Sequence, residues 1–253
     1  MNHLLAPGSR HVLAKVMQGA ALLAFDFDGT LAPITKRPSE AEMTLEVERV
    51  FRTLCKKCPC AVITGRRRAD VLKRLKGVPV KYVVGNHGIE PSAGAEKFAK
   101  VMRRAFRSLH AALANERGVE IENKLYSLSV HYRRAKNKRQ VRSKILTALA
   151  PQHAHVHTVP GKLVVNVLPI GAPDKGEALA RLCRLEGART LLYVGDDVTD
   201  ESVFRRHFRA FFCSVRVRKS ALSSARFYLK RQAEVRLLLT KLARLPNVGR
   251  QGR

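Results

Sequence analysis

A short apolar run that ends in two acids constrains this chain more than any other stretch. Residues 22–25 read as a buried strand, and Asp26 and Asp28 follow it with one residue between them. Side chains of a strand alternate between its faces, so the two carboxylates leave the strand end on the same side. Gly29 then lets the backbone turn. Because buried charges are normally paired or metal-bound, the strand end predicts a bound cation, with Mg²⁺ favoured by the oxygen ligands. Two solvated acids in a loop are the alternative.

Length and composition allow a substantial folded core. The chain has 253 residues, 45% of them hydrophobic, which fits one large domain or two modest ones. No apolar stretch approaches the roughly 18 residues of a membrane span. The run over residues 20–25 is also too short for a signal peptide. We therefore expect a cytoplasmic protein that does not associate with membranes.

The charge balance is strongly basic. Lys and Arg total 48 against 20 Asp and Glu, a formal net charge of +28. Residues 205–253 alone hold 14 basic residues and one acid, and residues 91–169 hold 15 basic and 4 acidic. This excess predicts attraction to anions, from phosphorylated metabolites up to nucleic acid. A small phosphate ester does not need so much charge, so non-specific association with polyanions is a second expectation.

The five cysteines do not make a convincing metal site. Cys55 and Cys58 have the spacing of half a zinc site, and Cys60 follows closely, but no second pair is present. A structural zinc normally takes four ligands. We therefore expect reduced thiols.

Short apolar runs alternate with helical patterns through most of the chain. An arm or a short helix is expected over residues 4–19, ahead of the first strand. Further strands are expected at 59–63, 80–84, 190–194 and 210–217, and helices at 40–57, 67–76, 174–185 and 233–245. This alternation is typical of an α/β protein with a parallel sheet.

The middle of the chain has a different pattern. It predicts a basic helix over 96–115, an alternating strand over 120–132, a helix over 137–149 and a hairpin over 153–168 that turns at Pro160 and Gly161. We expect an α+β insert at residues 91–169, within a discontinuous core made of residues 1–90 and 170–253.

Polar groups gather at four places where core strands end or helices begin. They are Asp26 with Asp28, Thr64, Lys175, and the acids Asp196, Asp197 and Asp200. In an open α/β sheet the ligand site lies beyond the carboxyl ends of the strands, which brings such groups together. Carboxylates, a hydroxyl and a lysine are the groups that phosphoryl transfer requires. Taken singly, Thr64 reads equally well as a helix N-cap, Lys175 as a surface lysine, and the acids as stabilising a helix N-terminus.

The order of these motifs resembles the haloacid dehalogenase superfamily of phosphatases. The motifs are DFDGTL from Asp26, TGR from Thr64, DKG from Asp174 and GDDVTDE from Gly195. With GNHGIE from Gly85 and the stretch Glu122–Arg133, the chain resembles the trehalose-6-phosphate phosphatase family over residues 22–242. The resemblance implies a Rossmann-like core with an inserted cap domain, and hydrolysis of a small-molecule sugar phosphate.

The resemblance also implies roles for the core residues. Asp26 would be the nucleophile, and Asp28 the general acid and then the general base. Thr64 would bind the phosphoryl group, and Lys175 would neutralise it and orient Asp26. Mg²⁺ would be held by Asp26, the Asp28 carbonyl and Asp196, with Asp197 and Asp200 supporting the metal.

Substrate contacts are implied near the core edge and in the cap. The residues are Gly65, Arg66, Asn86, His87, Gly88, Glu90, Glu122, Lys124, His131, Arg133 and Asn166. Arg66 reads as a solvated helix residue that also could reach the substrate phosphate, and the cap residues read equally as an exposed strand face. The family pattern Glu-x-Arg-Pro is replaced here by Asn166, Val167, Leu168 and Pro169. This departure keeps three substrate hypotheses open: trehalose 6-phosphate, another sugar or polyol phosphate, or a polyanion bound on a phosphatase scaffold.

Overall fold

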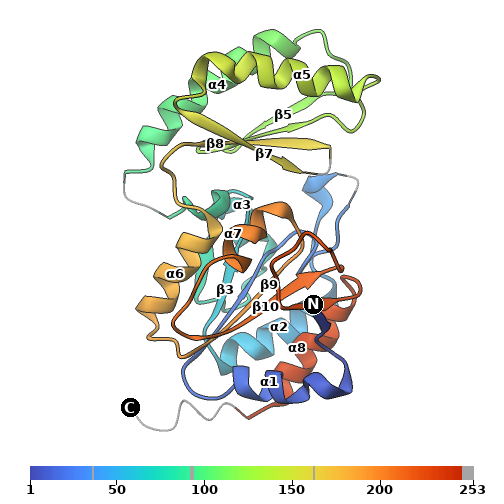
Figure 1. Ribbon diagram of the computed structural model, residues 1–253, viewed down its shortest axis with the longest axis vertical. Coiled ribbons are helices and arrows are strands. Elements are labelled where there is room, and N and C mark those ends of the chain that lie inside the picture. Colours follow the sequence, from blue (N-terminus) through green and yellow to red (C-terminus); the bar gives the residue numbers. More distant parts are fainter. Residues whose placement is uncertain (36, 92–93, 162, 247–253) are drawn as a thin grey trace. The chain divides into compact units, whose positions relative to one another are not determined.

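The computed structural model describes residues 1–35, 37–91, 94–161 and 163–246 (Figure 1). The chain divides into two compact units. One unit is discontinuous and consists of Met1–Gly88 and Asp174–Arg253, and the other is the continuous segment Ile89–Pro173. The limits expected from the sequence, a core at 1–90 and 170–253 around an insert at 91–169, stay a prediction of the domain boundaries. We refer to the two parts as the core unit and the inserted unit.

The core unit is built on a seven-stranded sheet in which every neighbouring pair of strands is parallel. The strands are β1 (Asn2–His3), β2 (Ala21–Phe25), β3 (Cys60–Ile63), β4 (Tyr82–Val84), β9 (Thr190–Gly195), β10 (Phe211–Val217) and β11 (Phe227–Leu229). Their order across the sheet is β1-β11-β10-β9-β2-β3-β4. From β2 the chain builds outward through β3 and β4, and it later returns to β9 on the other side of β2. The order in which strands are added to the sheet therefore reverses between β2 and β9, and α/β sheets bind ligands at such a point.

Helices cover both faces of this sheet. They are α1 (Arg10–Val16), α2 (Leu45–Lys57), α3 (Arg68–Arg74), α6 (Lys175–Leu185), α7 (Glu201–Phe204) and α8 (Glu234–Arg244). Apolar side chains of α1, α2, α3 and α8 share one buried cluster, while those of α6 and α7 belong to a second. Three-residue 3₁₀ turns lie at Pro7–Ser9, Pro38–Glu40, Asn86–Gly88 and Val198–Asp200.

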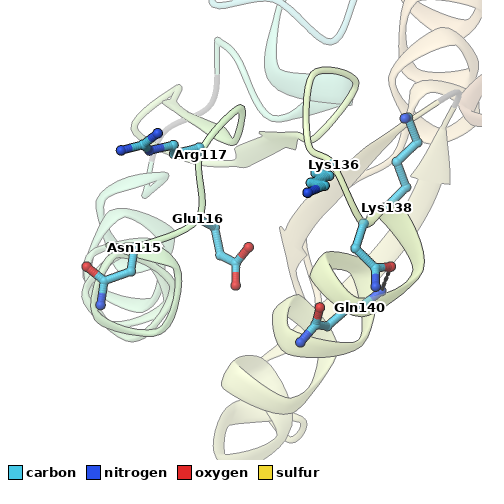
Figure 2. Close-up of a pocket in the computed structure, with 7 residues that line it drawn as sticks. Asn115, Glu116, Arg117, Lys136, Lys138 and Gln140 are labelled. Carbon is cyan, nitrogen blue, oxygen red and sulfur yellow. Dashed lines mark hydrogen bonds between the residues drawn. The ribbon is translucent and has the colours of Figure 1, made fainter.

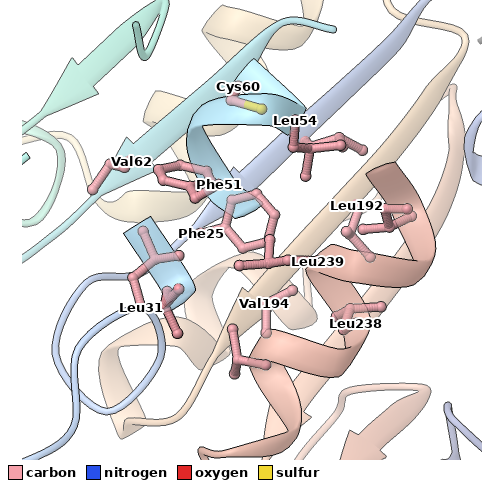
Figure 3. Close-up of a cluster of buried hydrophobic side chains, with 14 of the residues drawn as sticks. Phe25, Leu31, Phe51, Leu54, Cys60, Val62, Leu192, Val194, Leu238 and Leu239 are labelled. Carbon is pink, nitrogen blue, oxygen red and sulfur yellow. The ribbon is translucent and has the colours of Figure 1, made fainter. Parts of the chain in front are cut away.

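The central strands supply both clusters by simple alternation. In β2, Leu23 and Phe25 point to the α2 and α8 side, whereas Leu22 and Ala24 point to the α6 side. Figure 3 shows Phe25 packed among residues of α2, β9 and α8, and its ring meets that of Phe51 edge to face at 5.4 Å between centroids. A strand buried on both faces must be apolar throughout, which explains why this sheet could be predicted from continuous apolar runs.

Several core elements differ from their expected limits. Helix α2 begins at Leu45 rather than residue 40, because the Thr44 side chain accepts a hydrogen bond from the Val47 amide and caps the helix there. The N-terminal arm contains the short strand β1 as well as the helix α1, and β1 pairs with β11. Neither β1 nor β11 was predicted, since two or three residues carry too little periodicity.

The inserted unit is a four-stranded antiparallel sheet with two long helices on one face (Figure 1). Its elements are α4 (Glu96–Leu113), β5 (Glu120–Asn123), β6 (Leu128–His131), α5 (Lys138–Leu149), a 3₁₀ turn (Ala150–Gln152), β7 (Val156–Gly161) and β8 (Val164–Pro169). The sheet order is β5-β6-β8-β7. Apolar residues of both helices and one sheet face form a separate core, so the α/β class with an antiparallel insert agrees with the sequence prediction.

Two expectations about the inserted unit were wrong in detail. The single strand predicted over 120–132 is the hairpin β5–β6, which turns at residues 124–127 with Leu125 in the left-handed region at a φ of 72°. The second hairpin does not turn at Pro160 and Gly161, because both residues pair with β8 as part of β7. None of the described helices is long and apolar enough to cross a membrane.

Candidate active site

Asp26 follows β2 and Asp196 follows β9, and these are the two neighbouring strands between which the strand order reverses. β2 and β9 are neighbours, with Phe25 in register with Val194, and the Asp26 amide donates to the Val194 carbonyl at 2.9 Å. The two acids therefore leave the sheet at the same edge. Both are buried, with exposed fractions of 4% for Asp26 and 8% for Asp196. The alternative of two solvated acids is excluded for Asp26.

Lys175 is buried against these acids. Asp174 caps α6 through a capping box with Glu177, and this fixes the first residue of the helix. The Lys175 ammonium lies 3.1 Å from an oxygen of Asp26 and 2.8 Å from one of Asp200. Burial opposes the charge on Lys175, but the two carboxylates outweigh it and raise the pKa of the lysine. Lys175 is therefore a buried, permanently charged group rather than a surface lysine.

Asp200 is the group that holds Lys175 in place. One of its oxygens accepts from Lys175 and from the Tyr193 hydroxyl, at 2.8 and 2.7 Å. The other accepts from the Asp197 amide at 2.9 Å. Asp200 is fully buried, so these three donors satisfy a charge that has no access to water. Its hydrogen bonds make it a support for the lysine and for the turn after β9.

The acids at this edge outnumber the cations. Oxygens of Asp26, Asp196 and Asp200 lie within 4.8 Å of one another. Burial, reinforced by Asp200 and Asp197, raises the pKa of Asp196 to about 7. Burial also raises the pKa of Asp26 well above its usual range, although Lys175 opposes the shift. Crowded hard-oxygen ligands with raised pKa values are the chemistry of a divalent cation site, so these residues fit Mg²⁺.

Two glycines permit the close approach of these acids. A β-carbon on Gly29 would lie 2.2 Å from an Asp196 oxygen, and one on Gly195 would lie 2.4 Å from the Asp200 carboxyl carbon. Gly29 also has a φ of 77°, in the left-handed region. Both positions therefore exclude any side chain, which gives the glycines of the DFDGTL and GDDVTDE motifs a physical reason.

Asp28 is paired with an arginine, which the sequence did not predict. The guanidinium of Arg66 binds both Asp28 oxygens at 2.7 Å. Arg66 also contacts Asp70 at 2.8 Å, and Asp70 contacts Arg74 at 3.1 Å. Arg66 is only 8% exposed, so the interpretation of it as a solvated helix residue was wrong. It precedes α3 and ties the end of β3 to the turn after β2.

Thr64 and the turn at residues 86–88 lie at the ends of β3 and β4. The Thr64 hydroxyl accepts from the Arg66 amide at 3.2 Å, and the Thr64 carbonyl accepts from the His87 amide at 2.9 Å. The His87 ring fills the space where a β-carbon of Gly65 would lie, 2.5 Å from the nearest ring atom. Asn86, His87 and Gly88 are all buried with positive φ angles. Thr64 does not cap α3, which begins at Arg68 with no side-chain cap.

Asp197 has a local structural role in the turn after β9. Its side chain and that of Asp200 form a reciprocal capping box around the 3₁₀ turn Val198–Asp200. It is not one of the three acids whose oxygens converge. The support of Mg²⁺ by Asp197 and its ligation by the Asp28 carbonyl stay predictions.

Two further residues of the site were missed by sequence reasoning. Tyr193 is fully buried, and its hydroxyl donates a hydrogen bond to Asp200. The feature of the sequence that could have indicated this role is a lone hydroxyl within the apolar strand β9. Arg218 lies 2.8 Å from Asp196 and adopts a φ of 69°. Nothing in the sequence distinguishes Arg218 from the many basic residues around it.

The inserted unit gathers most of its predicted binding residues on one sheet face. Glu122, Ser129 and Asn166 are cross-strand neighbours on β5, β6 and β8. The Ser129 hydroxyl donates to the Asn166 amide oxygen at 2.7 Å. Glu122 lies 3.3 Å from His131 and 3.6 Å from Lys124. Leu128 and Val130 point the opposite way, into the core under the helices. We call this face, defined by Glu122, Lys124, Ser129, His131 and Asn166, the polar sheet face.

Two predicted binding residues lie outside this cluster. Glu90 is half-buried in the segment before α4, and Arg133 is exposed just beyond β6. A depression of about 800 Å³ also lies away from the polar sheet face, between the segment after α4 and the start of α5 (Figure 2). It is lined by Asn115, Glu116, Arg117, Lys136, Asn137, Lys138 and Gln140. None of these is a predicted site residue.

The chain combines a parallel sheet with an antiparallel insert, and two acids and a buried lysine lie where the strand order of the parallel sheet reverses. This combination defines a fold of the haloacid dehalogenase type. A sequence model of the trehalose-phosphatase family matches residues 24–232. The chain therefore belongs to the trehalose-phosphatase family, and the resemblance found in its motifs is confirmed.

Individual relatives agree with this assignment. A trehalose-phosphate phosphatase of Mycobacterium avium is 34% identical over 194 residues, which cover 71% of this chain and 49% of that protein. A trehalose 6-phosphate phosphatase of Zea mays is 29% identical over 263 residues, covering 91% and 72%. The chain spans about half the length of the mycobacterial relative.

Solved structures show the same fold. The C-terminal domain of Candida albicans trehalose-6-phosphate phosphatase superposes with a TM-score of 0.79 at 24% identity, covering 94% of this chain and 97% of that one. A trehalose-6-phosphate phosphatase of Aspergillus fumigatus gives a TM-score of 0.63 at 24% identity, covering 96% and 99%. These similarities establish the architecture of the chain.

Proposed function

We propose that this chain is a Mg²⁺-dependent phosphatase that hydrolyses trehalose 6-phosphate through an aspartyl-phosphate intermediate. The observation that carries the proposal is the buried group of Asp26, Lys175 and Asp200, with Asp196 beside it. A carboxylate next to a fixed cation and a divalent metal site is suited to attack on a phosphoryl group. Membership of the family supports the substrate.

In the first step, an oxygen of Asp26 forms a bond to phosphorus while the bond from phosphorus to the sugar oxygen breaks. Asp28 acts here in its protonated form, in which one oxygen carries the proton instead of accepting from Arg66, and it gives that proton to the departing sugar oxygen. In the second step, Asp28 takes a proton from water, the water oxygen bonds to phosphorus, and the Asp26 carboxylate leaves. The side chain of Asp28 is 39% exposed, so it remains accessible to substrate although Arg66 binds it.

The surrounding residues orient and neutralise the reacting groups. Lys175 holds Asp26 and balances charge on the phosphoryl oxygens, and Asp200 fixes Lys175. Asp26 and Asp196 would hold Mg²⁺, which supplies positive charge to the phosphoryl oxygens when it is bound. Thr64, Gly65 and Arg66 lie at the end of β3 and are proposed to contact the phosphoryl group. Asn86, His87 and Gly88 are proposed to border the sugar.

We assign sugar recognition to the inserted unit, acting as a cap. The polar sheet face offers a carboxylate, an ammonium group, a histidine and an amide for sugar hydroxyls, and we include Glu90 and Arg133 among the contacts. Within the pair formed by Ser129 and Asn166, the amide oxygen already accepts a hydrogen bond, so the amide nitrogen is left to donate. At the position of Asn166 the family pattern has a carboxylate, which accepts hydrogen bonds, whereas this chain presents an N–H donor. The difference supports a second candidate substrate, another sugar or polyol phosphate.

The decisive experiment measures phosphate release from a panel of sugar phosphates, with and without Mg²⁺. We expect trehalose 6-phosphate to be preferred, and Asp26→Asn to abolish release from every substrate while the protein stays folded by circular dichroism. Full activity of Asp26→Asn would refute the mechanism. A clear preference for a different sugar phosphate would refute the substrate and leave the mechanism intact.

Two broader expectations remain proposals. The high positive charge is proposed to attract polyanions in addition to the substrate. A cytoplasmic location, where sugar phosphates are made, is likewise a prediction.

A further inference from the structure

The helix layer of the inserted unit carries a dense set of exposed cations. Helices α4 and α5 together hold nine basic residues and one acid, Glu96. All nine are exposed: Lys97, Lys100, Arg103, Arg104, Arg107, Lys138, Arg139, Arg142 and Lys144. We call these nine side chains the basic helix face. The apolar residues of both helices point inward to the core of the unit, so the cations cover the outer side of the layer.

Most of this charge is not balanced within the molecule. Among the described residues, the nine side chains form one ion pair with an acid, between Lys144 and Glu116. In α4, Lys100, Arg104 and Arg107 follow one another at spacings of four and three residues, so they are surface neighbours. Like charges at these spacings destabilise a helix. The fold therefore maintains a positive surface that does not contribute to its own stability.

The basic helix face and the polar sheet face lie on opposite sides of the inserted unit. Leu128 and Val130 of β6 point toward the helices, whereas Ser129, between them, points to the other side of the sheet. The proposed sugar contacts are thus separated from the cations by the core of the unit. The basic helix face cannot be explained by contact with a sugar phosphate held on the polar sheet face.

We propose that the basic helix face is a docking surface for double-stranded nucleic acid, bound through its phosphate backbone without sequence preference. The row from Lys97 to Arg107 spans ten residues, or about 15 Å along α4. A duplex carries one negative charge per about 1.7 Å of its axis, so a row of this length faces several phosphates. Five of the nine cations are arginines, whose guanidinium groups suit phosphate oxygens.

The composition of the face argues against other anionic partners. Leu146 is the one large apolar side chain exposed on these two helices, whereas membrane-surface helices need an apolar face to insert. Phe98 and Phe106 pack inward, so these two helices leave one exposed ring, His110, on which a single-stranded base could stack. Protein interfaces have apolar or aromatic anchors in a centre depleted of charge. A strongly positive surface without such anchors resembles a protein–DNA interface.

The depression beside α5 extends this surface. Figure 2 shows Arg117 and Lys136 on the two loops that border it, with Lys138 at the start of α5. Arg117 and Lys136 are both exposed and, among the described residues, have no acidic partner. The depression therefore continues the positive charge of the helix layer around its end, where a duplex backbone could follow it.

The test compares the full-length protein with a variant in which Lys100, Arg104 and Arg107 are all replaced by glutamine. Binding to a mixed-sequence DNA duplex of about 20 base pairs is followed by fluorescence anisotropy from 50 to 200 mM salt. We expect binding in the micromolar range for the parent protein, and affinity at least about tenfold lower for the variant. Each lost phosphate contact should reduce the slope of log K against log salt by about 0.9, so the slope should fall by roughly 2 to 3.

The matched control neutralises three exposed cations of the core unit, Arg49, Lys56 and Lys73, again with glutamine. The control should retain the parent affinity, and both variants should retain phosphate release from the preferred sugar phosphate. Equal weakening by both variants would overturn the proposal, because the effect would then come from net charge. Absence of binding at 50 mM salt would also overturn it, as would tighter binding to phosphatidylserine vesicles or to single-stranded poly-dT. The activity assay is independent, so failure of the docking surface and failure of the proposed function are distinguishable.

Discussion

The pair formed by Arg66 and Asp28 is the contact that most changes the interpretation of the site at the level of single residues. A bidentate guanidinium fixes both the position and the orientation of a carboxylate. Asp70 and Arg74 in turn hold Arg66 from α3. If Asp28 is the group that moves protons, Arg66 is the residue that positions it. This positioning role acts on the steps in which a proton is transferred, whereas the contact with the phosphoryl group proposed for Arg66 would act on both kinds of leaving group alike.

This role predicts a dependence on the leaving group. Arg66→Gln should lower the single-turnover rate of sugar release by about 100-fold, the lower range for loss of general acid–base catalysis. The loss in the single-turnover rate of p-nitrophenolate release should be much smaller, because the phenolate departs without a proton. Single turnovers isolate this first step from the second, in which Asp28 activates water for both substrates alike. Arg66→Lys should recover part of the activity, since lysine offers one donor in place of a fork.

Asp28→Asn is the reference for that experiment and should show the same difference between the two substrates. Equal losses with both substrates in Arg66→Gln would contradict a positioning role, and would point instead to phosphate binding or folding.

The residues of the core site were predictable where a motif interrupts a strongly patterned strand. Asp26 and Asp196 could be found because each ends a continuous apolar run. The contact between Arg66 and Asp28 could not, since it joins residues 38 positions apart through side chains alone. Tyr193 escaped notice because a single hydroxyl in an apolar strand also reads as ordinary core.

At the level of secondary structure elements, long apolar strands were predicted well and short or irregular ones were not. Successive side chains of β2 and β9 point alternately into two apolar cores, one on each face of the sheet. Both strands therefore need a continuous apolar sequence, which is easy to recognise. The hairpin β5–β6 was taken for one strand because its turn contains neither glycine nor proline, and Leu125 itself adopts the left-handed conformation. Such a turn is specified by the packing of the sheet rather than by local sequence.

The turn after β2 gives a prediction at this scale. Gly29→Ala combines a left-handed backbone with a β-carbon that would meet Asp196. We expect about 1–2 kcal/mol of destabilisation from the backbone, about 1–3 kcal/mol more from overpacking, and loss of phosphate release because Asp196 is displaced. Chemical denaturation and the phosphate assay measure the two effects.

Gly19→Ala is the matched control for this turn. Gly19 has a φ of 81°, close to that of Gly29, but a β-carbon there would meet nothing within 4 Å. It should show the backbone cost alone and keep full activity. If the two variants behaved alike, the close approach of Asp196 to Gly29 would have no functional importance.

At the scale of the whole molecule, the core unit and the inserted unit have separate apolar cores, and the acids whose oxygens converge, among the described residues, belong to the core unit. A ligand that binds only the folded state stabilises it by mass action, by about 2.7 kcal/mol at one hundred times its dissociation constant. Saturating Mg²⁺ should therefore raise the free energy of unfolding of the core unit by about that amount.

Hydrogen exchange with and without Mg²⁺ tests this expectation element by element. Mg²⁺ should slow amide exchange in β2 and β9, which Asp26 and Asp196 follow, and in α6, which begins with Lys175. It should leave α4 and α5 unchanged, because the converging acids found among the described residues all lie in the core unit. Asp196→Asn should remove the protection, whereas Glu42→Gln, at an exposed acid paired with Lys76, should keep it. Protection that spread equally over α4 and α5 would show that the two units unfold together, and protection retained in Asp196→Asn would place the metal elsewhere.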